Sequence, residues 1–181
     1  MRIIAGRARG LRLEPPGDLP VRPSLDRVRE AVFSALTGRL AGARFLDLFA
    51  GTGANGLEAL SRGAAAATLV DANPRVCALI RRNLAKTRLH VDARVLLLDL
   101  PADLGRAADP AGAYDLVYAD PPHAFTQYEA LLEELDAHAL VAPDGWVVLE
   151  HPQQAEVPEV VGRWTRNRTR RYGRSGVTVF A

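Results

Sequence analysis

The sequence has very little cysteine and no long apolar run, and each scarcity excludes a class of protein. Cys77 is the one cysteine among 181 residues, so no disulfide can form within the chain, and a reducing cytoplasm is the expected location. Because Cys77 falls in a helical pattern, we interpret it as a buried thiol. No apolar run approaches the roughly 20 residues of a membrane-spanning helix. The first ten residues lack the apolar stretch of a secretory signal.

Lysine is also scarce, since Lys86 is the single lysine among 23 basic residues and the rest are arginine. Residues 1–30 carry seven arginines against four acidic residues. Residues 163–181 carry six arginines and no acidic residue, which leaves the middle of the chain acidic. Guanidinium groups match phosphate oxygens and stack on bases, so the basic ends indicate a polyanionic partner. The alternative is an arginine-rich surface that only faces water.

Residues 41–181 alternate between short apolar runs and helical patterns, which predicts an α/β fold. The predicted strands have near-continuous apolar character and occupy 44–48, 67–70, 93–98, 114–119 and 146–150. The predicted helices occupy 54–62, 74–88 and 127–138. Apolar strands separated by helices are typical of a parallel sheet covered on both faces. We therefore expect a Rossmann-like, doubly wound, mostly parallel sheet, with two antiparallel edge strands near 160–168 and 176–180.

Residues 1–40 are expected to form an extension to this core, within a single domain that spans the whole chain. Residues 2–13 predict two short strands around the turn Gly6–Gly10, as in a hairpin. A proline-rich loop follows, and Ser24 is a suitable N-cap for a helix.

Four successive predicted strands end in an acidic residue: Asp47, Asp71, Asp99 and Asp120. In an open α/β sheet, ligands bind beyond the carboxyl ends of the strands, where the strand order reverses. The four carboxylates are therefore expected to line one rim. Any single one of them has an alternative role as a cap for the next turn.

The turn over residues 51–56 matches the pattern G-x-G-x-x-G after a strand and before a helix. Such a turn can hold the pyrophosphate of a dinucleotide, and Asp71 has the spacing of a ribose-binding acid. Asp47 argues against this interpretation, because its negative charge would oppose a pyrophosphate but suits the ammonium of a methionine moiety.

The segment Asp120-Pro121-Pro122-His123 follows an apolar strand and indicates chemistry on an aromatic amine. The lone pair of such a nitrogen is delocalised into its ring. A carboxylate of Asp120 and the carbonyl of Pro121 can each accept one N–H, which directs the lone pair at an electrophilic methyl group. Pro122 rigidifies the turn, and a planar residue at His123 can stack on a base that has left its helix.

The sequence resembles a known family at several separate segments. Residues 47–53 (DLFAGTG) look like the first motif of Rossmann-like S-adenosylmethionine methyltransferases, and residues 120–122 look like their amino-methylating motif. Residues 22–30, residues 58–64 and the pair Tyr172-Gly173 resemble the RsmD type of bacterial 16S ribosomal RNA guanine-N2 methyltransferase. The similarity covers essentially the whole chain. His123 departs from the family, which has tyrosine or phenylalanine there.

The resemblance implies a cofactor, a substrate and a set of site residues. The cofactor is S-adenosylmethionine, and the substrate is 16S ribosomal RNA in the small ribosomal subunit or an assembly intermediate, methylated by a monomer without a metal. The implied cofactor-binding residues are Asp47, Phe49, Gly51, Thr52 and Gly53 for the methionine part, Asp71 for the ribose, and Asp99 and Leu100 for the adenine. The implied catalytic residues are Asp120, Pro121, Pro122 and His123.

The RNA-binding candidates come from the two basic ends of the chain: Arg22, Arg27 and Arg29, and Arg168, Arg170 and Arg171. The first group can instead pair with acidic residues along its own helix. The second can instead belong to a twisted edge strand whose arginines face water and whose aromatic residues pack inward.

Three other functions fit some of these patterns. The glycine turn alone permits a nicotinamide-dependent oxidoreductase. His123 permits an RNA-binding or ribosome-assembly protein that has the fold but has lost the activity. The Asp-Pro-Pro motif also suits an adenine-N6 methyltransferase, although 181 residues leave little room for a DNA-recognition domain.

Overall fold

The computed structural model describes residues 1–19, 26–89 and 93–181, with the backbone alone at 26 and 27. The described helices are α1 (Asp26–Ala35), α2 (Thr37–Leu40), α3 (Ala54–Ser61), α4 (Pro74–Thr87), α5 (Tyr128–Ala137) and the 3-10 turn η1 (Leu104–Ala107). The strands are β1 (Arg44–Leu48), β2 (Ala66–Asp71), β3 (Ala93–Leu97), β4 (Tyr114–Ala119), β5 (Val141–Pro152), β6 (Val160–Val161), β7 (Trp164–Tyr172) and β8 (Ser175–Phe180). The predicted cap Ser24 lies outside the described residues.

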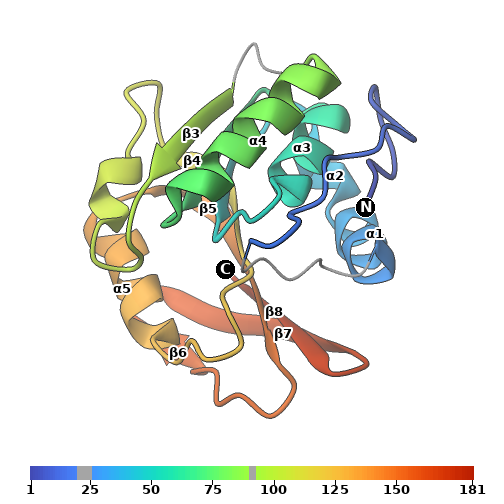
Figure 1. Cartoon of the computed structure of the whole chain (residues 1–181). Coiled ribbons are helices and arrows are strands. Elements are labelled where there is room, and N and C mark those ends of the chain that lie inside the picture. The colour runs from blue at the N-terminus through green and yellow to red at the C-terminus, as the bar shows by residue number, and fades with distance from the viewer. Residues whose placement is uncertain (20–25, 90–92) are drawn as a thin grey trace.

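The strands form one eight-stranded sheet in the order β3-β2-β1-β4-β5-β8-β7-β6 (Figure 1). Neighbours from β3 to β5 are parallel, and β5, β8, β7 and β6 pair antiparallel. The chain leaves β1 in one direction to build β2 and β3 and then returns to place β4 on the other side. This reversal between β1 and β4 confirms the predicted doubly wound, mostly parallel sheet.

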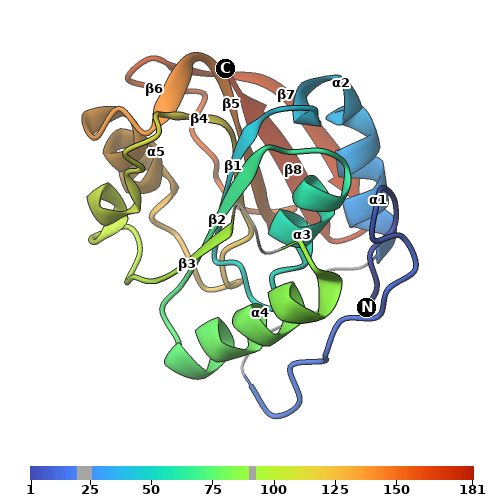
Figure 2. The same ribbon diagram turned by 90° about the horizontal axis from the view of Figure 1, so that it is seen from above.

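Helices cover both faces of the sheet (Figure 2). One face packs against α1, α3 and α4, with Phe33, Leu57 and Ile80 in the shared core. The other face packs against α5 and η1, with Leu132 and Leu104 in a second core. Strands between two such layers are apolar on both sides, as the sequence indicated.

The predicted strand over 146–150 is longer than expected and runs from Val141 to Pro152. Both of its edges are paired, by β4 on one side and by β8 on the other. Val141 pairs with Tyr114 and Trp146 with Leu116, so the register shifts between them and residues 142–145 form an irregular part of the strand that the side-chain pattern did not indicate.

Residues 2–13 pair antiparallel about the turn Gly6–Gly10, as predicted, although the pairing is short. An antiparallel bridge joins Arg2 and Arg12, and Ile3 N donates to the carbonyl of Leu11 at 2.9 Å. The turn between the two segments is held on α3. Ile4 N and Ala5 N donate to the Glu58 carboxylate at 2.8 and 3.1 Å, and Ala8 N donates to Ser61 Oγ at 2.9 Å. Side-chain oxygens of α3 therefore satisfy N–H groups of this turn.

Cys77 is buried on α4, as predicted. Its Sγ lies 3.5 Å from the carbonyl oxygen of Asp71 and 3.6 Å from that of Leu96, at the carboxyl ends of β2 and β3. Desolvation by burial, reinforced by the charge of Asp71, raises the pKa of the Cys77 thiol. No helix within 1–19, 26–89 or 93–181 is long and apolar enough to cross a bilayer.

Candidate active site

A cavity of about 580 Å³ opens at the carboxyl ends of β1, β2, β4 and β5. It lies where the strand order reverses, as expected for a ligand site of this architecture. Ten of the predicted cofactor and catalytic residues line it: Phe49, Gly51, Thr52, Asp71, Asp99, Leu100, Asp120, Pro121, Pro122 and His123. Asp47 and Gly53 do not.

The loop after β1 has an unusual backbone conformation. Phe49, Gly51 and Gly53 all have positive φ, at 59°, 55° and 79°. A Cβ at Gly53 would lie 3.2 Å from the side chains of Ile80 and Leu69, which explains why glycine is needed underneath the loop. The loop thus presents backbone and the Thr52 side chain to the cavity, and its glycines allow a ligand to approach the backbone closely.

Asp47 lies beneath this loop rather than in the cavity, which corrects the predicted direct contact with a methionine ammonium. The side chain is fully buried, and Asp47 Oδ2 accepts the N–H of Gly56 at 2.8 Å, so it fixes the start of α3. Burial raises the pKa of this carboxyl well above its usual range, and the charges of Asp120 and Asp71 add to the shift. Within the described chain, Asp47 Oδ1 has no hydrogen-bond partner.

Asp71 is the last residue of β2 and connects that strand to the loop. One carboxylate oxygen accepts the N–H of Gly51 at 3.1 Å, and the other accepts the N–H of Asn73 at 2.9 Å. Partial burial raises the pKa of Asp71, and these backbone donors oppose the shift. The carboxylate is therefore oriented in advance at the position where the resemblance implies a ribose.

The cavity is acidic. Its charged lining consists of the carboxylates Asp71, Asp99, Asp120 and Glu150, and within the described ranges no arginine or lysine lines it. Apolar walls come from Val76, Leu98 and Leu100. A pyrophosphate would face several negative charges there, whereas a cation beside an adenine-sized apolar wall is compatible with it. This lining favours a sulfonium ligand over a dinucleotide.

The Asp-Pro-Pro corner follows β4 directly. Asp120 N donates to the carbonyl of Leu48 at 3.3 Å, and Phe125 N closes a turn by donating to the carbonyl of Pro122 at 2.8 Å. Pro121 is buried, whereas Pro122 and His123 are exposed at the cavity mouth. The structure thus brings the corner and the glycine loop to one cavity, as the strand order predicts.

Glu150 is a cavity residue that sequence reasoning did not include among the site residues. It is buried near the end of β5, and its Oε2 accepts a hydrogen bond from the Tyr118 hydroxyl at 3.1 Å. Its neighbour His151 points to the opposite face, where Nε2 lies 2.9 Å from Thr178 Oγ1. The sequence did contain a signal for Glu150: the predicted strand over 146–150, which is the next strand after Asp120, also ends in an acidic residue.

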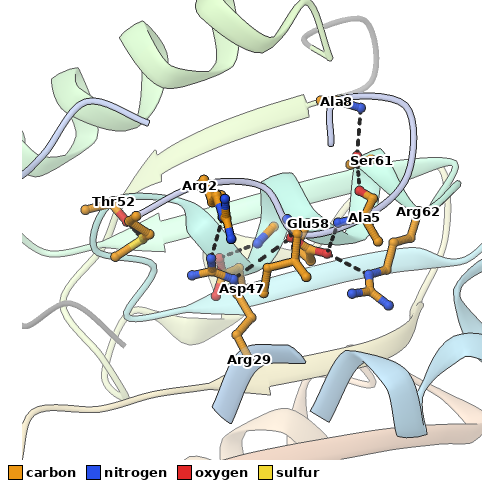
Figure 3. A network of polar contacts seen from close by, with 12 residues as sticks. Arg2, Ala5, Ala8, Arg29, Asp47, Thr52, Glu58, Ser61 and Arg62 are labelled. Carbon is orange, nitrogen blue, oxygen red and sulfur yellow. Dashed lines mark hydrogen bonds and ion pairs between the residues drawn. The ribbon is translucent and has the colours of Figure 1, made fainter. Parts of the chain in front are cut away.

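Of the three N-terminal RNA-binding candidates, the structure describes the side chain of Arg29. Arg22 and the side chain of Arg27 lie outside the described residues. Arg29 is 1% exposed, donates from Nη2 to the carbonyl of Arg2 at 2.6 Å, and lies 4.0 Å from Glu58 (Figure 3). A buried guanidinium cannot reach an RNA phosphate, so the assignment of Arg29 to RNA is wrong.

Arg168, Arg170 and Arg171 all lie on β7 and are exposed. Arg168 and Arg170 line a shallow groove beside α1, together with Val177 and Val179. Side chains alternate along a strand, so Arg171 lies on the opposite face of the sheet from Arg168 and Arg170. Trp164, at the start of β7, is buried and donates to the carbonyl of Leu132 at 3.1 Å, so this aromatic residue packs inward.

No cluster of three or more potential metal ligands occurs in the parts of the chain that the structure describes.

Comparison with known proteins agrees with this geometry. The chain is 34% identical over 180 residues to "Ribosomal RNA small subunit methyltransferase D" of Escherichia coli strain K12, covering 99% of this chain and 89% of that protein. It is 36% identical to the solved structure of hypothetical protein TTHA0928 of Thermus thermophilus, with a TM-score of 0.82 and coverage of 99% and 98%.

A more distant structure shares the fold alone. The RNA methyltransferase of Salinibacter ruber, solved in complex with S-adenosyl-L-homocysteine, is 16% identical with a TM-score of 0.65, over 87% of this chain and 92% of that one. The model of the family described as "Conserved hypothetical protein 95" matches residues 1–181. The chain therefore belongs to this family, the RsmD family of ribosomal RNA methyltransferases.

Proposed function

We propose that this protein transfers a methyl group from S-adenosylmethionine to the exocyclic N2 amine of a guanine in 16S ribosomal RNA. Membership of the family supports the methyltransferase activity on ribosomal RNA. The observation that carries the proposal is one acidic cavity containing both the glycine loop and the Asp-Pro-Pro corner. A cationic methyl donor and an amine acceptor can therefore meet in a single site.

The donor half of the cavity fits S-adenosylmethionine. The backbone of Gly51 and Thr52 would hold the methionine part, and the Asp71 carboxylate would accept the ribose hydroxyls. Asp99 would accept from the adenine amine, with Leu100 beside the ring. Asp47 acts from beneath, because it holds the start of α3 through the N–H of Gly56 and so supports the loop.

When bound, S-adenosylmethionine supplies an electrophilic methyl group on a positively charged sulfur. The Asp120 carboxylate and the Pro121 carbonyl would each accept a hydrogen bond from one N–H of the guanine amine. These two hydrogen bonds would orient the nitrogen lone pair toward that methyl group. The Asp120 charge also stabilises the positive charge that develops on the nitrogen. Transfer would break the C–S bond of the donor, leave S-adenosylhomocysteine, and be completed when the methylated nitrogen releases one proton to solvent.

The acceptor base must leave its stack to reach this corner. His123, exposed at the mouth, offers an imidazole face on which the base can stack. We place the surrounding RNA along β7, where Arg168, Arg170 and Arg171 are exposed. Neutralisation of phosphates by these guanidinium groups gives affinity without reading the sequence.

The test is transfer of a radiolabelled methyl group to small-subunit particles from cells that lack the gene, followed by nuclease digestion and identification of the nucleoside. We expect N2-methylguanosine at one position. N6-methyladenosine would show that the base assignment is wrong. No label on particles, together with binding of S-adenosylhomocysteine, would favour an assembly protein without activity, and tight NAD binding would favour an oxidoreductase.

A further inference from the structure

Glu150 is placed beside the acceptor corner by the register of the sheet. β4 and β5 run parallel, and their last paired residues are Ala119 and Leu149. Asp120 follows β4 directly and Glu150 is the next residue of β5, so this register brings the two residues side by side, at the ends of strands that lie about 4.8 Å apart. Both line the cavity.

The Glu150 carboxylate is also fixed in orientation. The side chain is 9% exposed, and its Oε2 accepts the hydroxyl of Tyr118 at 3.1 Å. Tyr118 is itself 1% exposed, and its ring packs against Phe33 with centroids 6.2 Å apart. Burial, together with the negative charge of Glu150, raises the pKa of Tyr118 well above its usual range. The phenol therefore stays protonated and remains a donor to Glu150.

Two acceptor groups on adjacent strands match one edge of guanine in particular. Guanine presents the N2 amine and the N1–H next to each other, so both are donors. Adenine presents its N6 amine next to N1, which is an acceptor without a proton. If Asp120 and Pro121 hold the amine, the neighbouring ring nitrogen faces the β5 side of the corner. A carboxylate there attracts an N–H and repels a lone pair.

We propose that Glu150 accepts the N1–H of the target guanine and thereby selects guanine over adenine, with Tyr118 as the residue that positions it. This inference rests on the proposed function, because it assumes that an amine is held at Asp120. The Asp-Pro-Pro motif can hold the amine of either purine, and Glu150 would explain why this protein acts on guanine.

The test replaces the target guanine by 2-aminopurine, which keeps the N2 amine but has an acceptor at N1. Small-subunit particles are reconstituted with splint-ligated 16S RNA that carries guanosine or 2-aminopurine riboside at the position methylated by the wild-type protein. Wild type is expected to prefer guanine in kcat/KM by about a thousandfold or more, as sites built to bind an N–H or O–H do.

The informative variant is Glu150→Gln, since an amide still accepts the Tyr118 hydroxyl but can also donate to an N1 acceptor. We expect kcat/KM on guanine to fall at least about tenfold, transfer to 2-aminopurine to rise, and their ratio to shrink at least about a hundredfold. Affinity for S-adenosylhomocysteine is expected to stay unchanged. Glu133→Gln, on the exposed surface of α5, is the matched control and should leave the ratio at the wild-type value.

An unchanged guanine to 2-aminopurine ratio in a Glu150→Gln protein that binds S-adenosylhomocysteine normally would overturn the inference and leave the proposed function intact. If that variant does not fold, the same ratio is measured for Tyr118→Phe, which keeps the ring but removes the hydroxyl that positions Glu150. We expect it to lower the ratio several-fold, and an unchanged ratio overturns the inference. Wild-type methylation of adenine instead would overturn the proposed function itself.

Discussion

The acidic side chains of Asp47 and Asp71, near the carboxyl ends of β1 and β2, are buried or half-buried and held by backbone groups, whereas the arginines Arg168, Arg170 and Arg171 on β7 stand in solvent. Asp47 and Asp71 each accept backbone N–H groups of the glycine loop or of the helix that follows it. Arg168 and Arg170 are exposed on an antiparallel strand near the sheet edge. The first region can orient reacting groups, and the second can only attract a polyanion over a broad area. Substitutions should therefore have steep effects in the cavity and graded effects on β7.

The largest effect is expected for Asp120→Ala, which removes the proposed acceptor for the amine proton. Single-turnover transfer of labelled methyl to small-subunit particles should fall about a thousandfold or more, which corresponds to about 4 kcal/mol of barrier. Calorimetry should show that S-adenosylhomocysteine still binds. Asp144→Ala, at an exposed position before the final part of β5, is the control with wild-type transfer. Normal turnover of the Asp120 variant would remove this residue from the mechanism.

Arg29→Ala should produce the largest loss of stability, although the change looks like the loss of one surface arginine in the sequence. It removes a fully buried side chain that bonds the carbonyl of Arg2, while Glu58 keeps Arg62 at 2.7 Å, so we expect the cavity and the lost hydrogen bond to cost about 3 kcal/mol. Urea unfolding measures the difference. Arg168→Ala, on the exposed β7 surface, should change the free energy of unfolding by less than about 0.5 kcal/mol. Equal effects of the two variants would contradict the burial of Arg29.

A pair of glycines tests how tightly the N-terminal segment is held on α3. Gly6 and Gly10 both have φ of 82°, but a Cβ at Gly6 would lie 1.8 Å from the Ser61 carbonyl oxygen, and none of the described atoms lies within 4 Å of one at Gly10. Gly10→Ala should cost about 1 kcal/mol for backbone strain alone. Gly6→Ala should cost about 2 to 3 kcal/mol, seen as a lower melting temperature, because the clash adds to the same strain.

The smallest effect per residue is expected on β7. Replacing Arg170 and Arg171 together by alanine should weaken RNA binding and reduce the slope of log affinity against log salt by about one to two. Cofactor affinity should not change. Arg75→Ala with Arg82→Ala is the matched control, because these exposed arginines on α4 already pair with Asp18 and Glu14. If the control pair reduces the slope as much as the β7 pair, the RNA does not lie along β7.

Much of the fold was accessible from the sequence because its signals are local. Continuous apolar runs between helical patterns predicted β1 to β4 within a residue or two, and Pro74 marked the start of α4. The aspartates that end successive strands indicated which edge of the sheet binds the ligand. Because the carboxyl ends of parallel strands meet at one edge, most predicted site residues line one cavity.

The remaining features depend on contacts between distant segments. Nothing local distinguishes Arg29 from Arg27, and its burial follows from packing against Glu58 and the backbone of Arg2. The short antiparallel pair at residues 2–13 was predicted, but nothing local indicates that α3 binds the turn between its two segments. Asp47 precedes the glycines as expected, yet the tight loop places it below the ligand surface. Glu150 joins Asp120 only through the register of β4 and β5.

The thiol of Cys77 lies at the ends of β2 and β3, under the wall of the donor cavity. With one cysteine in the sequence and a raised pKa, the folded protein should react very slowly with a thiol-specific reagent. The rate of that reaction would thus report how often α4 lifts away from the sheet. An occupied donor cavity would slow the labelling in proportion to its occupancy, so ligand binding can be followed in the native chain without any added probe.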